Sequence, residues 1–392
     1  MLSLGETPLA NALLTAEQLE QPEPKFPLDL VFCPRCTLVQ ITEEVPPETM
    51  FGDYLYFSSF SDTMVRHAEA IATRLVAQQK LGPGSLVVEV ASNDGYLLQH
   101  YAKAGVPVLG VEPARNVAKV AVEKGIRTLV SFFGRDVAAE LAAKGERADV
   151  IHANNVLAHV PDLNGVVAGF ATLLKDDGVL VVECPYVRDF VEHCEFDTIY
   201  HEHLCYFSLT ALDLLTARHG LEIHDVEKLP IHGGSIRIFA SKRGAYPRRE
   251  SVVTMLADEK AQRVDQHGYY ADFATRVNAL KHDLVKLLAD LKAKGARVGA
   301  YGAAAKGATL LNFFGIGRES LDFVVDRSTY KQGRFMPGAK LPILPPEALL
   351  ERKPEYCLLL TWNFADEILE QQRAYRDAGG KFVIPIPEVR IV

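Results

Sequence analysis

Two stretches of this chain, residues 85–113 and 296–326, share one pattern: an apolar run, a turn of small residues, a helical stretch, and a second apolar run that ends in an acid, Glu112 or Asp326. Short apolar runs bounded by turns predict buried strands. Strands that alternate with helices predict a parallel, doubly wound sheet, which binds ligands at the carboxyl ends of its strands. We therefore expect an α/β protein with two Rossmann-like units.

The rest of the chain extends this alternation. Further strands are expected at residues 149–159, 178–184, 231–240, 355–361 and 381–384, and helices at 62–79, 166–174, 209–219 and 250–294. A chain of 392 residues is too long for one ordinary hydrophobic core. We place a small irregular unit at residues 1–48, a central α/β domain at 49–245, and a long helix with a second α/β domain at 246–392.

Charge and cysteine content argue against several classes of protein. The formal net charge is -8 and no run of Lys and Arg is sustained, which argues against a nucleic-acid binder. No stretch approaches the roughly 20 apolar residues of a membrane span, and the first residues lack a signal-peptide pattern. Six cysteines are too few for a disulfide scaffold in a chain of this length. We expect a cytoplasmic monomer with no nucleic-acid or membrane partner.

The first α/β unit carries the signs of a nucleotide-binding site. Glu89 lies in its first strand, residues 93–95 form the following turn, and Glu112 ends its second strand. A turn of small residues lets a ligand approach the backbone, and an acid at the end of the second strand accepts hydrogen bonds from ribose hydroxyls. The glycine-rich dinucleotide fingerprint is absent, which disfavours NAD and FAD, and Glu89 with Gly95 fits the S-adenosylmethionine variant better. An α/β domain without a cofactor is the alternative.

The densest group of proton-handling side chains is Tyr200-His201-Glu202-His203, and eight of the 12 histidines lie within residues 152–232. A histidine beside a carboxylate is a common general base near neutral pH. In an extended segment or tight loop, residues two apart share a face, so His201 would lie on the same face as His203. The alternative is a buried polar cluster that only satisfies its own hydrogen bonds.

Three weaker signals remain. Cys33 and Cys36 form a Cys-x-x-Cys after a short strand, which is half of a zinc-ribbon knuckle, but a structural zinc site needs four ligands and no second pair is present. Residues 53–60 combine aromatic and hydroxyl side chains that suit a sugar. The turn at residues 302–307 could bring Lys306 and backbone N–H groups to a phosphate. Reduced cysteines in a hairpin, an aromatic linker and a surface lysine are the structural alternatives.

Taken together, these features resemble one family, the S-adenosylmethionine-dependent C-methyltransferases of deoxysugar nucleotides. The resemblance covers nearly the whole chain. It rests on these segments in order: Leu4-Gly5-x-Thr7-Pro8-Leu9-Ala10-Asn11, Cys33-x-x-Cys36-x-Leu38-Val39-Gln40, Tyr54-x-Tyr56-Phe57-Ser58-Ser59, Glu89-Val90-Ala91-Ser92-Asn93-Asp94-Gly95, Asn154-Asn155-Val156-Leu157-Ala158-His159, Tyr200-His201-Glu202-His203-x-x-Tyr206-Phe207-Ser208, His232-Gly233-Gly234-Ser235-Ile236-Arg237, Gly302-Ala303-Ala304-Ala305-Lys306-Gly307 and Val325-Asp326-Arg327.

The resemblance implies a zinc-binding N-terminal domain, a central methyltransferase domain and a Rossmann-like C-terminal domain. It implies a nucleotide-linked 4-keto deoxysugar as substrate and S-adenosylmethionine as cofactor. The implied cofactor-binding residues are Glu89, Asn93, Gly95, Glu112 and Asn154. The implied substrate-binding residues are Tyr54, Tyr56, His232 and Lys306.

The implied reaction begins at a carbon beside the keto group, whose C–H bond is acidic. His203 would remove that proton, and the enolate carbon would then take the methyl group. Glu202 would orient or tune His203, while Tyr200 and His159 would hold the oxygen on which negative charge develops. Methylation at C-3 and at C-5 are both compatible with this set.

One departure from the family concerns zinc. Family members carry a first Cys-x-x-Cys ahead of the segment that begins at Leu4, and this chain starts three residues before it. Cys33 and Cys36 are then half a site, and we expect little or no bound zinc. The competing hypotheses are a nicotinamide oxidoreductase, a small-molecule O-methyltransferase and a non-catalytic sugar-nucleotide-binding protein.

Overall fold

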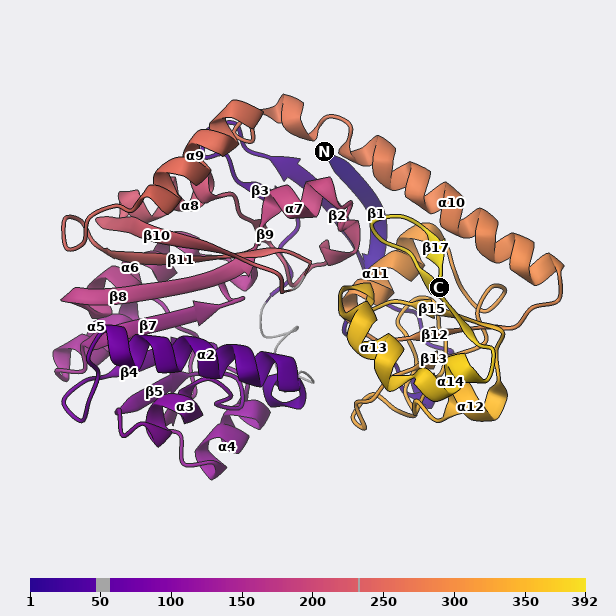
Figure 1. Ribbon diagram of the computed structural model, residues 1–392, viewed down its shortest axis with the longest axis horizontal. Helices are drawn as coiled ribbons and strands as arrows, with labels where there is room; N and C mark the ends of the chain where they lie inside the picture. Colours follow the sequence, from indigo (N-terminus) through magenta and orange to yellow (C-terminus); the bar gives the residue numbers. More distant parts are fainter. Residues whose placement is uncertain (47–56, 232) are drawn as a thin grey trace.

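A computed structural model of the protein describes residues 1–46, 57–231 and 233–392. In these residues the strands form three sheets, of four, seven and six strands. Figure 1 shows the two larger sheets in separate lobes, here called the seven-stranded lobe and the six-stranded lobe. The candidate substrate residues Tyr54, Tyr56 and His232 lie outside the described residues.

The seven-stranded sheet has the order β10-β11-β8-β7-β4-β5-β6. Its strands are β4 Val87–Val90, β5 Val108–Val111, β6 Thr128–Leu129, β7 Ala148–Asn154, β8 Leu174–Pro185, β10 Leu221–Leu229 and β11 Ser235–Lys242. Strands β4 to β8 pair in parallel, but β11 pairs antiparallel with both of its neighbours. The expected parallel direction is therefore wrong for β11, because a short connection and no crossover helix joins it to β10.

Helices cover both faces of this sheet, as a doubly wound fold requires. The helices between residues 62 and 218 are α2 Asp62–Gln78, α3 Leu98–Lys103, α4 Arg115–Glu123, α5 Arg135–Ala143, α6 Leu163–Leu173, α7 Val187–Glu192 and α8 Leu209–Arg218. Three of them, α2, α6 and α8, match the expected helical stretches. Helix α2 begins at a Ser61 cap, whose hydroxyl accepts from the N–H of Met64.

The four-stranded sheet joins the N-terminus to the middle of the chain. Its order is β1-β2-β3-β9, with β1 Leu2–Pro8, β2 Lys25–Phe32, β3 Val39–Ile41 and β9 Cys205–Tyr206. Cys33 and Cys36 lie in the turn between β2 and β3. Strand β9 follows residues 200–203, here called the histidine-rich segment, and pairs antiparallel with β3, which holds that segment against the N-terminal unit.

The six-stranded sheet has the order β14-β13-β12-β15-β16-β17 and is parallel except for β17. Its strands are β12 Val298–Tyr301, β13 Val324–Val325, β14 Ile343–Leu344, β15 Tyr356–Leu359, β16 Lys381–Ile384 and β17 Arg390–Ile391. Its helices are α11 Ala305–Phe314, α12 Ala348–Arg352, α13 Ala365–Gln371 and α14 Arg373–Asp377. The expected α/β fold class, with a second Rossmann-like unit, is confirmed.

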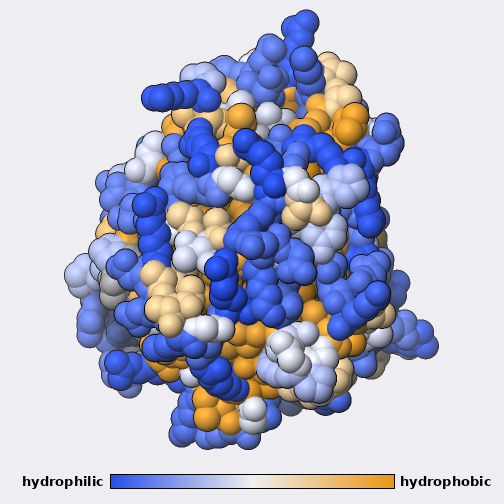
Figure 2. All heavy atoms as spheres, turned by 90° about the vertical axis from the view of Figure 1, so that its left-hand side faces the viewer, coloured by the Kyte–Doolittle hydropathy of each residue, from blue (hydrophilic) through white to orange (hydrophobic). Residues whose placement is uncertain are grey.

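The long helix expected at residues 250–294 is interrupted. Helix α9, Glu250–Gln262, ends at Arg263, which has a left-handed φ of 61°, and α10 runs over Phe273–Ala293. The two helices extend along one side of the molecule and join the lobes (Figure 1). Among the described residues, no helix combines the length and the apolar character needed to cross a membrane. Figure 2 shows that the outer face of the seven-stranded lobe is mostly hydrophilic.

Candidate active site

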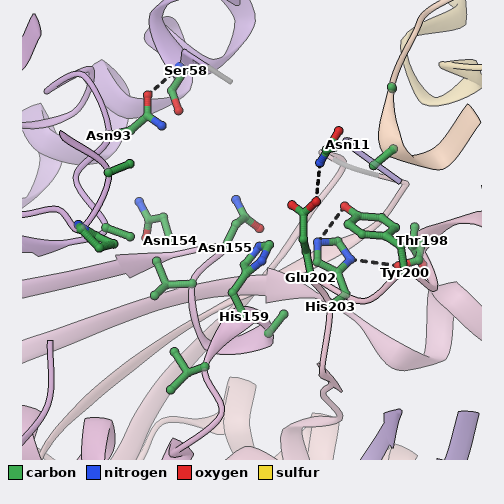
Figure 3. A pocket seen from close by; sticks show the side chains of 18 of the residues that line it. Asn11, Ser58, Asn93, Asn154, Asn155, His159, Thr198, Tyr200, Glu202 and His203 are labelled. Carbon is green, nitrogen blue, oxygen red and sulfur yellow. Dashed lines mark hydrogen bonds between the residues drawn. The ribbon is translucent and has the colours of Figure 1, made fainter. Parts of the chain in front are cut away.

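One cavity of about 1180 Å³ lies where the three sheets meet. Its wall combines the carboxyl ends of β4, β5 and β7, the histidine-rich segment, the N-terminal segment after β1, and the start of α11. Figure 3 shows Asn93 and Asn154 toward one end of the cavity and Glu202 and His203 toward the other, with Asn155 and His159 between them. Ligands of Rossmann-like sheets bind at these strand ends.

At the first strand end, Glu112 is held in place by the backbone. Its Oε2 accepts from the N–H of Asn93 at 2.8 Å, and its Oε1 accepts from the N–H of Ala114 at 2.8 Å. Asn93 has a left-handed φ of 50°, and its Oδ1 accepts from the N–H of Ser58 at 3.0 Å. Burial raises the pKa of Glu112. A carboxylate anchored through one lone pair on each oxygen keeps further acceptor sites for a ligand.

Glu89 and Gly95 lie outside the cavity wall. Glu89 is 1% exposed, and burial raises its pKa well above the ordinary value. Gly95 has a φ of 77°, and a Cβ there would lie 3.0 Å from Cγ1 of Ile126. Gly95 therefore shapes the turn that carries Asn93. The structure brings Asn93, Glu112 and Asn154 to the wall and leaves Glu89 and Gly95 behind it.

Two neighbouring amides lie at the end of β7: Asn154 is its last residue and Asn155 follows it. The Oδ1 atoms of Asn154 and Asn155 are buried and have no hydrogen-bond partner among the described residues. Asn155 has a left-handed φ of 56°, and its N–H donates to the carbonyl of Glu183 at 2.8 Å. Buried amide oxygens without partners are costly, so these two are suited to donors of a ligand. Asn155 was not among the predicted site residues.

Residues 200–203 form a tight turn, in which the N–H of His203 donates to the carbonyl of Tyr200 at 2.8 Å. The rings of Tyr200 and His203 lie 4.0 Å apart, and the Tyr200 hydroxyl is 2.8 Å from Nε2 of His203. Nδ1 of His203 is 2.9 Å from the carbonyl of Thr198. A carbonyl only accepts, so Nδ1 carries the hydrogen, and Nε2 accepts from the Tyr200 hydroxyl.

The same turn sends Glu202 and His201 in opposite directions. Glu202 reaches the cavity, where its Oε1 accepts from Nδ2 of Asn11 at 2.6 Å, and burial raises its pKa to about 7. His201 lies outside the wall, with Nε2 3.1 Å from the carbonyl of Pro27. The expectation that His201 shares a face with His203 is therefore wrong, because in this tight turn the residues two apart do not point to the same side.

His159 completes this group from the other side. It ends the 3₁₀ helix η3, Leu157–His159, and its ring centroid lies 4.7 Å from that of His203 in an edge-on arrangement. Burial lowers the pKa of His159 to about 4, and a hydrogen bond with the backbone of Glu202 opposes this shift. His159 is therefore neutral near pH 7. Figure 3 shows its ring beside Glu202 and His203.

The six-stranded lobe supplies cations to the facing wall, from Lys306, Lys331 and Arg334. The ammonium of Lys306 is buried without a hydrogen-bond partner among the described residues and lies 4.8 Å from the ring centroid of Trp362. Lys331 donates to the carbonyl of Ala303 at 2.8 Å. With the N-terminus of α11 on the same wall, these charges are suited to an anionic group.

The described residues around Cys33 and Cys36 do not fit a closed zinc site. Thr37 has a left-handed φ of 59°, and its N–H donates to the carbonyl of Cys33 at 2.8 Å. Backbone N–H groups of Cys36 and Arg35 lower the pKa of the Cys33 thiol. Nowhere in the described part of the chain do three or more His, Cys, Asp or Glu side chains form a group that could hold a metal ion. Two thiols leave a tetrahedral shell incomplete.

Comparisons with known proteins cover the whole chain. Three family models match consecutive segments: "Putative zinc binding domain" at residues 1–51, "Methyltransferase domain" at 64–226 and "C-methyltransferase C-terminal domain" at 230–387. The C-methyltransferase NovU of Streptomyces niveus is 38% identical over 393 residues, which span 100% of this chain and 94% of that protein.

Two further similarities cover part of the chain. The ubiquinone biosynthesis O-methyltransferase of Bartonella quintana is 34% identical over 97 residues, 24% of this chain and 39% of that protein. Among solved structures, the magnesium protoporphyrin IX methyltransferase of Synechocystis PCC 6803 with bound SAM is 17% identical with a TM-score of 0.36. That match covers 50% of this chain and 88% of the other.

Proposed function

This chain belongs to the S-adenosylmethionine-dependent C-methyltransferases, and on that premise we propose that it methylates a carbon beside the keto group of a nucleotide-linked 4-keto deoxysugar. The observation that carries the proposal is the hydrogen-bonded pair of Tyr200 and His203 on the wall of the shared cavity. A base is needed only where the methyl acceptor must first lose a proton, as a carbon acid must.

The cofactor would be held at the carboxyl ends of β4, β5 and β7. Glu112 would accept from ribose hydroxyls with the lone pairs that the backbone leaves open. Asn154 and Asn155 offer buried oxygens that lack partners among the described residues, which supports a ligand rich in donors at this end. When bound, S-adenosylmethionine supplies an electrophilic methyl group on a sulfonium.

The substrate would lie between this end and the histidine-rich segment. On its arrival the Tyr200 hydroxyl turns from Nε2 of His203 to the keto oxygen, and the Nε2 lone pair then accepts the carbon-bound proton. The hydrogen on Nδ1 stays bonded to the carbonyl of Thr198, so the ring keeps its orientation as it becomes charged. The Tyr200 hydroxyl stabilises the enolate oxygen as a donor, and neutral His159 joins it when its single N–H turns from the Glu202 backbone to that oxygen.

The nucleotide part of the substrate would face the six-stranded lobe. A diphosphate carries negative charge, and Lys306, Lys331 and Arg334 lie on that wall. The Lys306 ammonium is buried and has no hydrogen-bond partner among the described residues. A phosphate oxygen would accept a hydrogen bond from it. This arrangement favours a nucleotide-linked sugar over a free sugar.

Hydrogen exchange separates proton removal from methyl transfer. With S-adenosylhomocysteine in place of the methyl donor, the protein should exchange the proton beside the keto group of a nucleotide-linked 4-keto deoxysugar with deuterium from the solvent. His203→Ala should lose both exchange and methylation by about 10²–10⁴-fold, the usual contribution of a general base. The control is His219→Ala, whose ring contacts Asn164 away from the cavity. Full activity of His203→Ala would refute the proposed mechanism.

A further inference from the structure

A buried hydrogen bond joins the two lobes next to the catalytic pair. Nε1 of Trp362, the single tryptophan of the chain, donates to Oδ2 of Asp197 at 2.7 Å. Asp197 lies in the 3₁₀ helix η4, Phe196–Thr198, of the seven-stranded lobe, and Trp362 begins η6, Trp362–Phe364, of the six-stranded lobe. Asp197 is 0% exposed and Trp362 is 8% exposed.

Two further contacts hold η4 against the same lobe. The ring of Phe196 stacks on that of Phe314 with centroids 4.8 Å apart. The carbonyl of Ile199 accepts from the hydroxyl of Thr309, a residue of α11, at 3.2 Å. The residues on both sides of Thr198 are thus fixed by the six-stranded lobe.

Thr198 is the residue of η4 that faces the reaction. Its carbonyl accepts the Nδ1 hydrogen of His203 at 2.9 Å and the hydroxyl hydrogen of Tyr206 at 3.2 Å. This carbonyl determines which ring nitrogen of His203 carries the hydrogen and which carries the lone pair. The path from Trp362 to the lone pair on Nε2 therefore consists of Asp197, the η4 backbone and the Thr198 carbonyl.

We propose that Trp362 and Asp197 are positioning residues for His203, through which the six-stranded lobe aims the Thr198 carbonyl and keeps the hydrogen of the His203 ring on Nδ1. The inference rests on the proposed role of His203 as the base. It gives the six-stranded lobe a part in the proton transfer in addition to binding.

The chemistry of the pair agrees with this role. Burial raises the pKa of Asp197 to about 7, while Lys306 and the Trp362 indole act in the opposite direction. Burying a carboxyl costs desolvation free energy, and an apolar contact would hold the two lobes together without that cost. What a hydrogen bond adds is direction. The Lys306 ammonium packs on the Trp362 ring and also lies on the cavity wall, so a ligand at this wall contacts the same assembly.

The test uses Trp362→Phe, which keeps an aromatic ring at this position and removes the N–H donor. ¹⁵N spectra of histidine-labelled protein should show His203 with its hydrogen on Nδ1 in the wild type and a mixture of both tautomers in the variant. We expect kcat to fall by about 10-fold or more, since small displacements of reacting groups cost up to about 10²-fold. S-adenosylhomocysteine affinity should change by less than about twofold, because the cofactor end is untouched.

Two matched variants bracket this result. Asp197→Asn keeps an oxygen that accepts from the indole, so it should retain the wild-type tautomer and most of kcat. Arg276→Met removes another contact between α10 and the seven-stranded lobe, where Arg276 donates to the carbonyls of Val191 at 2.7 Å and Glu192 at 3.3 Å. In the described part of the chain Arg276 contacts α7 and lies outside both η4 and the cavity wall, so this variant should match the wild type in both measurements.

An unchanged His203 tautomer in Trp362→Phe overturns the inference, whatever its activity. If that variant does not fold, Thr309→Val decides: a shifted tautomer supports the inference and an unchanged one overturns it. The tautomer is measured without turnover, so this outcome is independent of the proposed function, which fails separately if His203→Ala is fully active.

Discussion

Replacing Glu202 by glutamine should make the protein more stable at neutral and alkaline pH. Burial raises the pKa of this carboxyl from 4.5 to about 7, so the folded state disfavours its ionised form. Below about pH 4.5 the carboxyl is protonated in both states and carries no penalty; the penalty grows between pH 4.5 and 7 and is complete above 7. At about 1.4 kcal/mol per pKa unit, Glu202→Gln should gain about 3 kcal/mol at pH 8 and less than about 1 at pH 5.

The glutamine oxygen can still accept from Nδ2 of Asn11, so the variant keeps the partner and removes the charge. Urea midpoints followed by the fluorescence of Trp362 at pH 5 and pH 8 measure the difference. The control is Glu123→Gln on the exposed face of α4, where the carboxylate lies 3.9 Å from Lys119, and its effect should stay within about 0.5 kcal/mol. An equal gain at both pH values would refute the reasoning, as would unchanged stability at both.

Four further outcomes follow from the site. Glu112→Ala should weaken binding of S-adenosylhomocysteine by about 1–3 kcal/mol in calorimetry, the scale of a buried charged hydrogen bond, and NADH binding at this site would contradict the assignment. His201→Ala should keep most of the deuterium exchange but lower the melting temperature, because the His201 ring lies outside the cavity and is hydrogen-bonded to the carbonyl of Pro27 in β2. Loss of exchange without loss of stability would contradict this. Lys306→Met should raise KM for the nucleotide-linked sugar by about 10-fold or more and leave the affinity for S-adenosylhomocysteine unchanged, and an unchanged KM would argue against the diphosphate contact. Elemental analysis of this chain should find well under one zinc per molecule, since Cys33 and Cys36 supply two of four ligands, and one tightly held zinc would refute that expectation.

The parts of the site that follow a strand could be predicted from the sequence. Apolar runs identify β4, β5 and β7, and the residues at their carboxyl ends, Asn93, Glu112 and Asn154, do line the cavity. Local pattern was sufficient here because a parallel sheet brings successive strand ends to one edge. The domain limits at residues 48 and 245 remain predictions.

The contacts that orient the catalytic group could not be predicted this way. Asn11 meets Glu202 across 191 positions, and Lys331 reaches the cavity from the other lobe. The direction of His201 depends on the turn, and the turn is held by the pairing of β9 with β3. No pattern within a few residues carries that information. The sequence contained one signal for this contact: Asn11 carries a side-chain amide and ends the motif that begins at Leu4.

The pairing of β9 with β3 also decides how this chain can be recombined with a relative. Residues 1–48 look like a cassette along the sequence, yet the last strand of their sheet is contributed by residues 205–206. A chimera with a single crossover point near residue 48 would therefore take β1, β2 and β3 from one protein and β9 from the other, so the two parts of this sheet would not have evolved together. We expect a functional chimera to require the exchange of residues 1–48 together with the segment that contains β9. The part of the gene that must be exchanged as a unit is therefore discontinuous.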